Sequence, residues 1–206
     1  MAGKTGWRGQ GGLRSLLVVA AVALGVTGCG TLGLSRSLDG NGTMDSQRVD
    51  RSFRDDTLVS RLKPVRLRLQ NGWQAAPTGS LHPNADLEAH NLDQSMFLIV
   101  LGEDRNAVAP GNLEDQANFY LQILKGGFAQ VIGNQARTGV ERINGFPAVQ
   151  YEVRGEVSQR PVAYLHTTVE MGDNYYQVVV WTPDDLRVAN SEAMRAIAQE
   201  FREAQQ

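Results

Sequence analysis

The chain has 206 residues, of which 20 are Lys or Arg and 22 are Asp or Glu, and its formal net charge is −2. Residues 1–28 hold three basic residues and no acid, so residues 29–206 have a formal charge of −5. This charge argues against nucleic acid as a partner, because phosphates require clustered Lys and Arg. It also argues against electrostatic attachment to anionic lipid headgroups. The length indicates one domain of ordinary core volume plus a shorter segment.

The first 28 residues have the pattern of an export signal. Lys4, Arg8 and Arg14 form a basic start, and the apolar run Leu16–Val26 follows them. This run is too short to cross a bilayer as a helix, which needs about 20 apolar residues. We therefore predict a signal peptide over residues 1–28.

The signal ends at Cys29, the one cysteine of the chain. The preceding Val-Thr-Gly resembles the lipobox of bacterial lipoproteins, although Val26 stands where Leu is usual. A single thiol in an oxidising compartment has no disulfide partner, and a thiol can accept a diacylglycerol. We predict that Cys29 carries diacylglycerol and palmitate, since two or three acyl chains anchor a protein stably. The alternatives are an ordinary secretory signal with an incidental cysteine, or a short anchor that is never cleaved.

The residues after the cysteine indicate where the protein is held. Gly30 follows Cys29, whereas an Asp there would favour retention at the inner membrane in enteric-type sorting. We therefore expect a lipid-anchored protein of the bacterial cell envelope, at the outer membrane and facing the periplasm. Residues 29–61 are rich in polar residues and poor in aliphatic ones, a composition that buries too little surface to fold. They are predicted to be a tether, followed by a single domain over residues 62–206.

The first half of this domain contains three predicted strands and a helix. Val65–Leu69 alternates between apolar and basic residues and predicts a half-buried strand, and Leu87–His90 is a weaker strand. Met96–Leu101 is apolar at every position, which predicts a strand buried on both faces. Asn112 has the features of a helix N-cap, and the apolar residues after it keep helical spacing. This helix is expected to end at Gly126.

The second half contains two predicted hairpins and a closing helix. An Asn-Gly turn joins Val140–Ile143 to Ala148–Arg154. The second hairpin pairs Val162–Glu170 with Tyr175–Trp181. The last apolar residues, up to Phe201, keep helical spacing and predict a C-terminal helix that packs on the sheet. The order of strands, helix, antiparallel strands and helix is typical of an α+β fold.

Several core and turn patterns over residues 63–203 resemble the DcrB-like members of the PsbP-like superfamily. They are Pro64 through Gly72-Trp73, Ala89-His90-Asn91 leading into Phe97–Val100, the helix after Asn112, Gly145-Phe146-Pro147-Ala148, and the closing segment that ends in Phe201. The resemblance implies an α/β/α sandwich in which helices cover an antiparallel β-sheet on both faces. It also implies a non-enzymatic role in binding or assembly, with no catalytic set to carry over.

The residues that could carry chemistry form no recognised motif. His82, His90 and His166 lack the i, i+2 spacing that strand metal sites often use, and we interpret His166 as a partly exposed, hydrogen-bonded strand residue. The paired carboxylates lie beside turns or helix starts, where acids favour the positive end of a helix or solvent. These pairs are Glu103-Asp104, Glu114-Asp115 and Asp184-Asp185. We predict no catalytic residue, no metal and no cofactor, and a hydrolase site assembled from distant residues is the weakest alternative.

The aromatic residues near strand ends are the candidate binding residues. An exposed cluster of Trp73, Tyr175 and Trp181 would form a surface for a partner or ligand, whereas core packing is the simpler explanation. The leading hypothesis is a membrane-anchored, non-enzymatic binding or assembly-support module with a protein partner in the envelope. The alternative is a carrier of a small apolar ligand, held in a pocket between helix and sheet.

Overall fold

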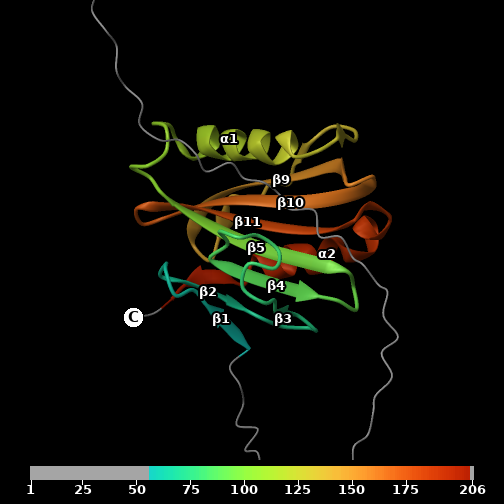
Figure 1. Ribbon diagram of the computed structural model, residues 1–206. Coiled ribbons are helices and arrows are strands. Elements are labelled where there is room, and N and C mark those ends of the chain that lie inside the picture. Colours follow the sequence, from blue (N-terminus) through green and yellow to red (C-terminus); the bar gives the residue numbers. More distant parts are fainter. Residues whose placement is uncertain (1–55, 205–206) are drawn as a thin grey trace, which may run out of the picture.

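A computed structural model describes residues 56–204 of the chain (Figure 1). The predicted signal peptide, Cys29 and nearly all of the predicted tether lie outside the described residues. The elements in chain order are β1 (Thr57–Val59), β2 (Val65–Arg68), β3 (Gln74–Ala75), β4 (Leu87–Asn91), β5 (Met96–Asp104), α1 (Leu113–Gly126), β6 (Gln130–Val131), β7 (Ala136–Arg137), β8 (Arg142–Ile143), β9 (Phe146–Val157), β10 (Arg160–Met171), β11 (Asn174–Pro183), a 3-10 turn (Asp184–Leu186), α2 (Arg187–Ala198) and β12 (Phe201–Glu203). Within residues 56–204, no helix is long and apolar enough to span a bilayer.

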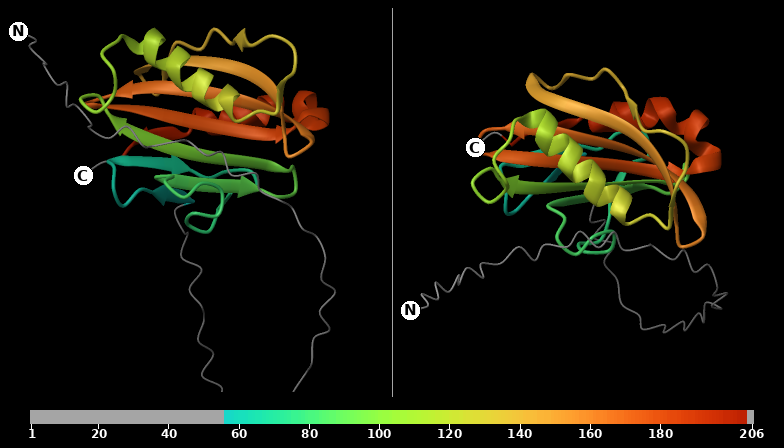
Figure 2. Two further views of the ribbon diagram at one scale, coloured as in Figure 1. Left: turned by 45° about the horizontal axis from the view of Figure 1, so that its top comes forward. Right: turned by 90° about the horizontal axis from the view of Figure 1, so that it is seen from above.

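A nine-stranded antiparallel sheet forms most of the domain. Its strands follow the order β3-β4-β5-β11-β10-β9-β6, and the two-residue strands β7 and β8 also pair with β9. A separate sheet has the order β1-β2-β12. The large sheet is strongly curved, with α1 across one face and α2 on the other (Figures 1 and 2). Val65, Leu67 and Phe201 of the small sheet pack with Met194 and Ile197 of α2 in one hydrophobic core.

The expectation that helices cover both faces of the sheet is wrong. A helix is about 10 Å wide and neighbouring strands lie about 4.8 Å apart, so one helix covers roughly two strands. Helix α1 packs on β9 and β10 and leaves β4 and β5 to a loop over residues 76–86. The Glu88 carboxylate fixes this loop, because it accepts hydrogen bonds from the backbone N–H groups of Gly79, Leu81 and His82. On the opposite face, α2 shares the cover with the small sheet, so the fold is mainly antiparallel β.

Several local predictions are confirmed. Asn112 caps α1, since its side chain accepts from the Asp115 N–H at 3.0 Å and the Asp115 carboxylate accepts from the Asn112 N–H at 3.1 Å. Strand β5 is buried on both faces over residues 96–101. The closing helix ends at Ala198, however, and Phe201 belongs to a strand rather than to that helix. Phe201 lies opposite Leu67 of β2, where it is almost completely buried.

Candidate partner-binding surface

Four aromatic side chains form a stacked row on the face of the large sheet that carries α1. The antiparallel register places Phe97, Trp181 and Tyr164 next to one another on β5, β11 and β10. The ring centroids of Phe97 and Trp181 are 5.6 Å apart, and those of Trp181 and Tyr164 are 6.0 Å apart. Phe128, just after α1, stacks on Tyr164 at 5.4 Å. We call Phe97, Trp181, Tyr164 and Phe128 the aromatic row.

A glycine in strand β9 makes room for the last ring of the row. A Cβ atom on Gly155 would overlap the ring of Phe128, far inside normal van der Waals distance. Glycine inside a strand often marks a close approach of another group, and here that group is an aromatic side chain. Gly155 therefore allows the Phe128 ring to lie against β9, where it stacks on Tyr164 as the last ring of the row.

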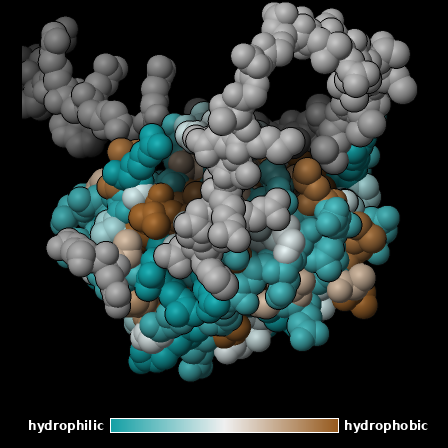
Figure 3. All heavy atoms as spheres, turned by 90° about the horizontal axis from the view of Figure 1, so that it is seen from below, coloured by the Kyte–Doolittle hydropathy of each residue, from teal (hydrophilic) through white to brown (hydrophobic). Residues whose placement is uncertain are grey.

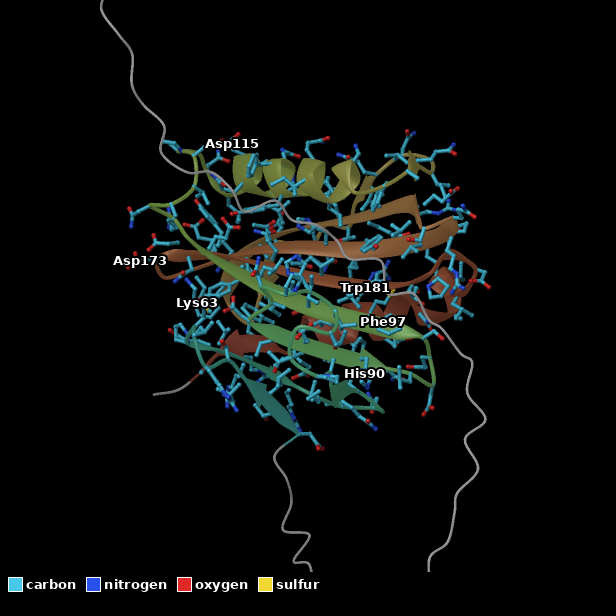
Figure 4. All side chains as sticks on the ribbon, viewed as in Figure 1. Lys63, His90, Phe97, Asp115, Asp173 and Trp181 are labelled. Carbon is cyan, nitrogen blue, oxygen red and sulfur yellow. The ribbon has the colours of Figure 1, made fainter. Side chains whose placement is uncertain are left out.

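The aromatic row is only partly covered. Phe97 and Tyr164 are buried, whereas Trp181 and Phe128 are half-buried. Figure 4 shows Phe97 and Trp181 side by side, with His90 on the neighbouring strand β4. The turn over residues 92–95 leads into β5 two residues before Phe97. On the opposite face of the sheet, the Thr182 hydroxyl donates to the Ser95 carbonyl at 3.2 Å. Leu92 in this turn is 61% exposed, and Trp181 is the more accessible of the two rings on β5 and β11.

The structure does not bring the three predicted aromatic residues together. Trp73 is buried in the hydrophobic core on the α2 side of the large sheet. Tyr175 is also buried, and the Arg105 guanidinium lies 5.1 Å from the centre of its ring. Only Trp181 belongs to the aromatic row. Tyr164 was missed, although a two-residue turn at Gly172-Asp173 fixes the hairpin register that places it opposite Trp181.

No protein-family model and no curated protein sequence match the chain. Among solved structures, it resembles the cyanobacterial PsbP protein CyanoP from Synechocystis sp. PCC 6803, with 15% identity, a TM-score of 0.49 and coverage of 71% of this chain and 91% of that one. It also resembles LpqN, involved in cell envelope biogenesis of Mycobacterium tuberculosis, with 14% identity, a TM-score of 0.44 and coverage of 68% of this chain and 83% of that one. A third similar structure is the Saccharomyces cerevisiae Ran-binding protein Mog1p, with 10% identity, a TM-score of 0.47 and coverage of 71% of this chain and 94% of that one. Values of this size identify neither a shared site nor a lipid anchor.

The three histidines lie on three different segments of the fold, and the burial of His166 differs from its prediction. His166 on β10 is not partly exposed but only 2% exposed, beneath α1. Burial lowers the pKa of His166 to about 4, and its Nδ1 atom has no hydrogen-bond partner among the described residues. His82 lies in the loop over residues 76–86 and His90 on β4. Within residues 56–204, no three His, Cys, Asp or Glu side chains are grouped so that they could hold a metal ion.

The carboxylates are engaged in structural contacts. Asp184 accepts two hydrogen bonds from the Arg154 guanidinium, at 2.6 and 2.5 Å, and these hold the pKa of Asp184 below its ordinary value. Arg187 pairs with Glu152 at 2.9 Å. Beside this ion pair, β9, β10 and α2 line a shallow hollow with room for about one water molecule. Glu114 accepts a hydrogen bond from the Tyr151 hydroxyl at 2.7 Å.

Proposed function

We propose that this chain is a non-enzymatic binding module of the bacterial cell envelope, held at the membrane by a lipid on Cys29, and that the aromatic row receives a protein partner. The observation that carries the proposal is the half-buried Trp181 within a row of stacked rings. Trp and Tyr are over-represented among the residues that contribute most to protein interfaces. An exposed apolar residue, Leu92, lies in the turn that leads into β5 and Phe97.

The rigidity of the aromatic row favours binding. Trp181 is held between Phe97 and Tyr164, so a partner would not have to order its ring. Ordering a flexible side chain at an interface costs about 0.5–1.5 kcal/mol, and a preorganised ring avoids that cost. All three rings belong to central strands of the large sheet, which fixes their relative positions.

The alternative of an apolar-ligand carrier has no comparable support. It places a ligand between helix and sheet, where Ala117 and Leu121 of α1 are fully buried against the sheet. Their side chains occupy the space that such a ligand would need. The partner-binding proposal instead uses a surface that α1 leaves partly open.

Photo-crosslinking in cells tests the partner surface. A benzophenone amino acid at Leu92 in the full chain is expected to give one discrete adduct, which Trp181→Ala abolishes. Phe119→Ala is the matched control, because Phe119 is 46% exposed on α1 outside the row. Thermal unfolding of both variants verifies that they are folded. An absent adduct, or one that survives Trp181→Ala, would contradict the proposal.

Fractionation tests the lipid anchor separately. Cys29→Ser is expected to remain unprocessed or to leave the membrane when membranes are washed in roughly 1 M salt, which screens electrostatic contacts beyond about 3 Å. A Cys29→Ser chain that is processed normally and stays in the washed membranes would show that the anchor is not at this cysteine.

A further inference from the structure

The outer face of the small sheet carries arginines in cross-strand register. Val59, Arg66 and Arg202 lie directly opposite one another on β1, β2 and β12. The residues that alternate with them, including Leu67, point into the hydrophobic core. Arg68 is two residues beyond Arg66 on β2 and is exposed on the same face. Three guanidinium groups are therefore close together on one surface.

This arrangement costs stability within the domain. Residues directly opposite on antiparallel strands have Cβ atoms about 4.5–5.5 Å apart, and like charges there repel. Arg202 pairs with Glu200 at 3.1 Å, but among the described residues Arg66 has no ion-pair partner. The Nε atoms of both arginines are buried without a hydrogen-bond partner in the described part of the chain. An external anion that contacts the rest of the guanidinium groups would remove the repulsion between them.

The positive charge is concentrated against the overall balance. Residues 1–55 hold seven of the 20 basic and four of the 22 acidic residues of the chain, so the described domain has 13 basic and 18 acidic residues. Five of those 13 lie on the small sheet and its β1–β2 turn, and we call them the basic face: Arg61, Lys63, Arg66, Arg68 and Arg202. Glu200 pairs with Arg202, and Glu203 of β12 lies opposite Val65. Lys63 lies near Asp86 and donates to the Asn174 side chain at 2.7 Å. The net charge of the whole chain is negative and therefore does not indicate this local basic surface.

Apolar side chains accompany the basic face. Leu62, in the β1–β2 turn, is 84% exposed, and Val59 is 54% exposed. Figure 3 views this side of the molecule, where hydrophobic residues form separate patches among hydrophilic ones. Basic residues next to protruding apolar ones are typical of surfaces that lie on anionic membranes.

The position of the basic face in the chain identifies its partner. β1 is the first described strand, so the predicted tether that begins at Cys29 joins the domain at this sheet. Twenty-six residues lie between Cys29 and Asp56, which limits the distance between the two to roughly 90 Å. We propose that the basic face docks on an anionic membrane surface, where its arginines contact lipid phosphates and Leu62 enters the headgroup region. Arginine binds phosphate with two parallel hydrogen bonds, and a tethered domain needs only weak contacts to stay docked.

Vesicle flotation tests this docking without the lipid anchor. The full chain with Cys29→Ser is mixed with vesicles of phosphatidylcholine alone or of phosphatidylcholine with phosphatidylglycerol. Replacement of Arg66, Arg68 and Arg202 by Gln is expected to weaken binding to the anionic vesicles by roughly tenfold or more. The matched control replaces Arg142, Arg160 and Arg195 by Gln, which removes the same charge from β8, β10 and α2. Residues 1–28 are identical in all variants, so their contribution cancels.

Two further arms decide between interpretations. Leu62→Asp is expected to weaken binding, whereas Val188→Asp, at a position 74% exposed on α2, is not. Equal weakening by both charge variants would show that net charge alone matters and would overturn the proposal. Equal binding of the parent chain to neutral and anionic vesicles would also overturn it. Inorganic phosphate that displaces the chain at constant ionic strength would assign the face to free phosphate instead. Failure of this experiment leaves the aromatic row untouched, because the row lies on the α1 face of the large sheet.

Discussion

Replacement of His166 is expected to change how the stability of the domain depends on pH. His166 is fully enclosed beneath α1, and burial lowers its pKa to about 4 from an ordinary value of 6.5. In the unfolded chain this histidine takes up a proton as the pH falls through 6.5. In the folded domain it stays neutral until the pH approaches 4. Its contribution to stability is therefore complete above pH 6.5 and is lost as the pH falls towards 4.

The size of this effect follows from the two pKa values. Their difference corresponds to roughly 3 kcal/mol in full, of which about 2 kcal/mol is lost between pH 7.5 and pH 5. The parent domain should therefore lose about 2 kcal/mol of unfolding free energy over this range from His166. His166→Gln should remove that part of the dependence. Other groups titrate alike in both proteins, so the difference between them isolates His166.

Urea unfolding at several pH values between 7.5 and 5 measures the difference. His82→Gln is the matched control, because burial also lowers the pKa of His82 but His166 remains in that variant. His82→Gln should keep most of the pH dependence. If His166→Gln and the parent lose the same free energy between pH 7.5 and pH 5, the argument that buried His166 stays neutral is refuted.

Three further variants test single contacts by urea unfolding. Asp184→Asn removes the acceptor of two Arg154 hydrogen bonds and should cost about 1–2 kcal/mol at pH 7. Because the pKa of Asp184 is below its ordinary 3.8, this cost should disappear as the pH falls through the folded value, and a constant cost down to pH 2 would contradict it. Gly155→Ala should lower the free energy of unfolding by about 1–3 kcal/mol, because the new methyl group displaces Phe128. The same substitution should cost much less in a Phe128→Ala background, and equal costs in both backgrounds would refute the close contact. Arg66→Gln should stabilise the domain by about 0.2–1 kcal/mol at low salt and have no effect at roughly 1 M salt; destabilisation at low salt would show that the repulsion is not significant.

Local sequence signals predicted the local structure well. Asn112 and Asp115 predicted the start of α1 correctly, because a capping box depends only on two residues that are three positions apart. The hairpin of β10 and β11 followed from the turn between them, since a short turn fixes the register of both strands. Trp181 was predicted as a candidate binding residue because it is a large aromatic residue close to a strand end.

Long-range pairing was beyond those signals. Phe201 keeps helical spacing with Ile197, yet it pairs with Leu67 in another part of the chain, which no local pattern reveals. The same pairing places Arg202 beside Arg66, so the basic face was invisible in the net charge. The α/β/α prediction failed because amphipathic segments show that helices pack on a sheet but not how much of it they cover.

The first and last strands of the domain share one neighbour, which affects how the domain responds to force. β1 and β12 both pair with β2, and their register places Thr57 opposite Arg68 at one end of β2. The Ala204 N–H donates to the Pro64 carbonyl at 2.9 Å at the other end, so the two ends of the fold leave the small sheet at opposite ends of β2. Tension transmitted from the N-terminal side reaches only the three residue pairs that join β1 to β2. These three pairs would separate before the long central strands carry any load. A fusion added at the C-terminus would leave the sheet beside Pro64, at the other end of β2 from the point where tension enters β1.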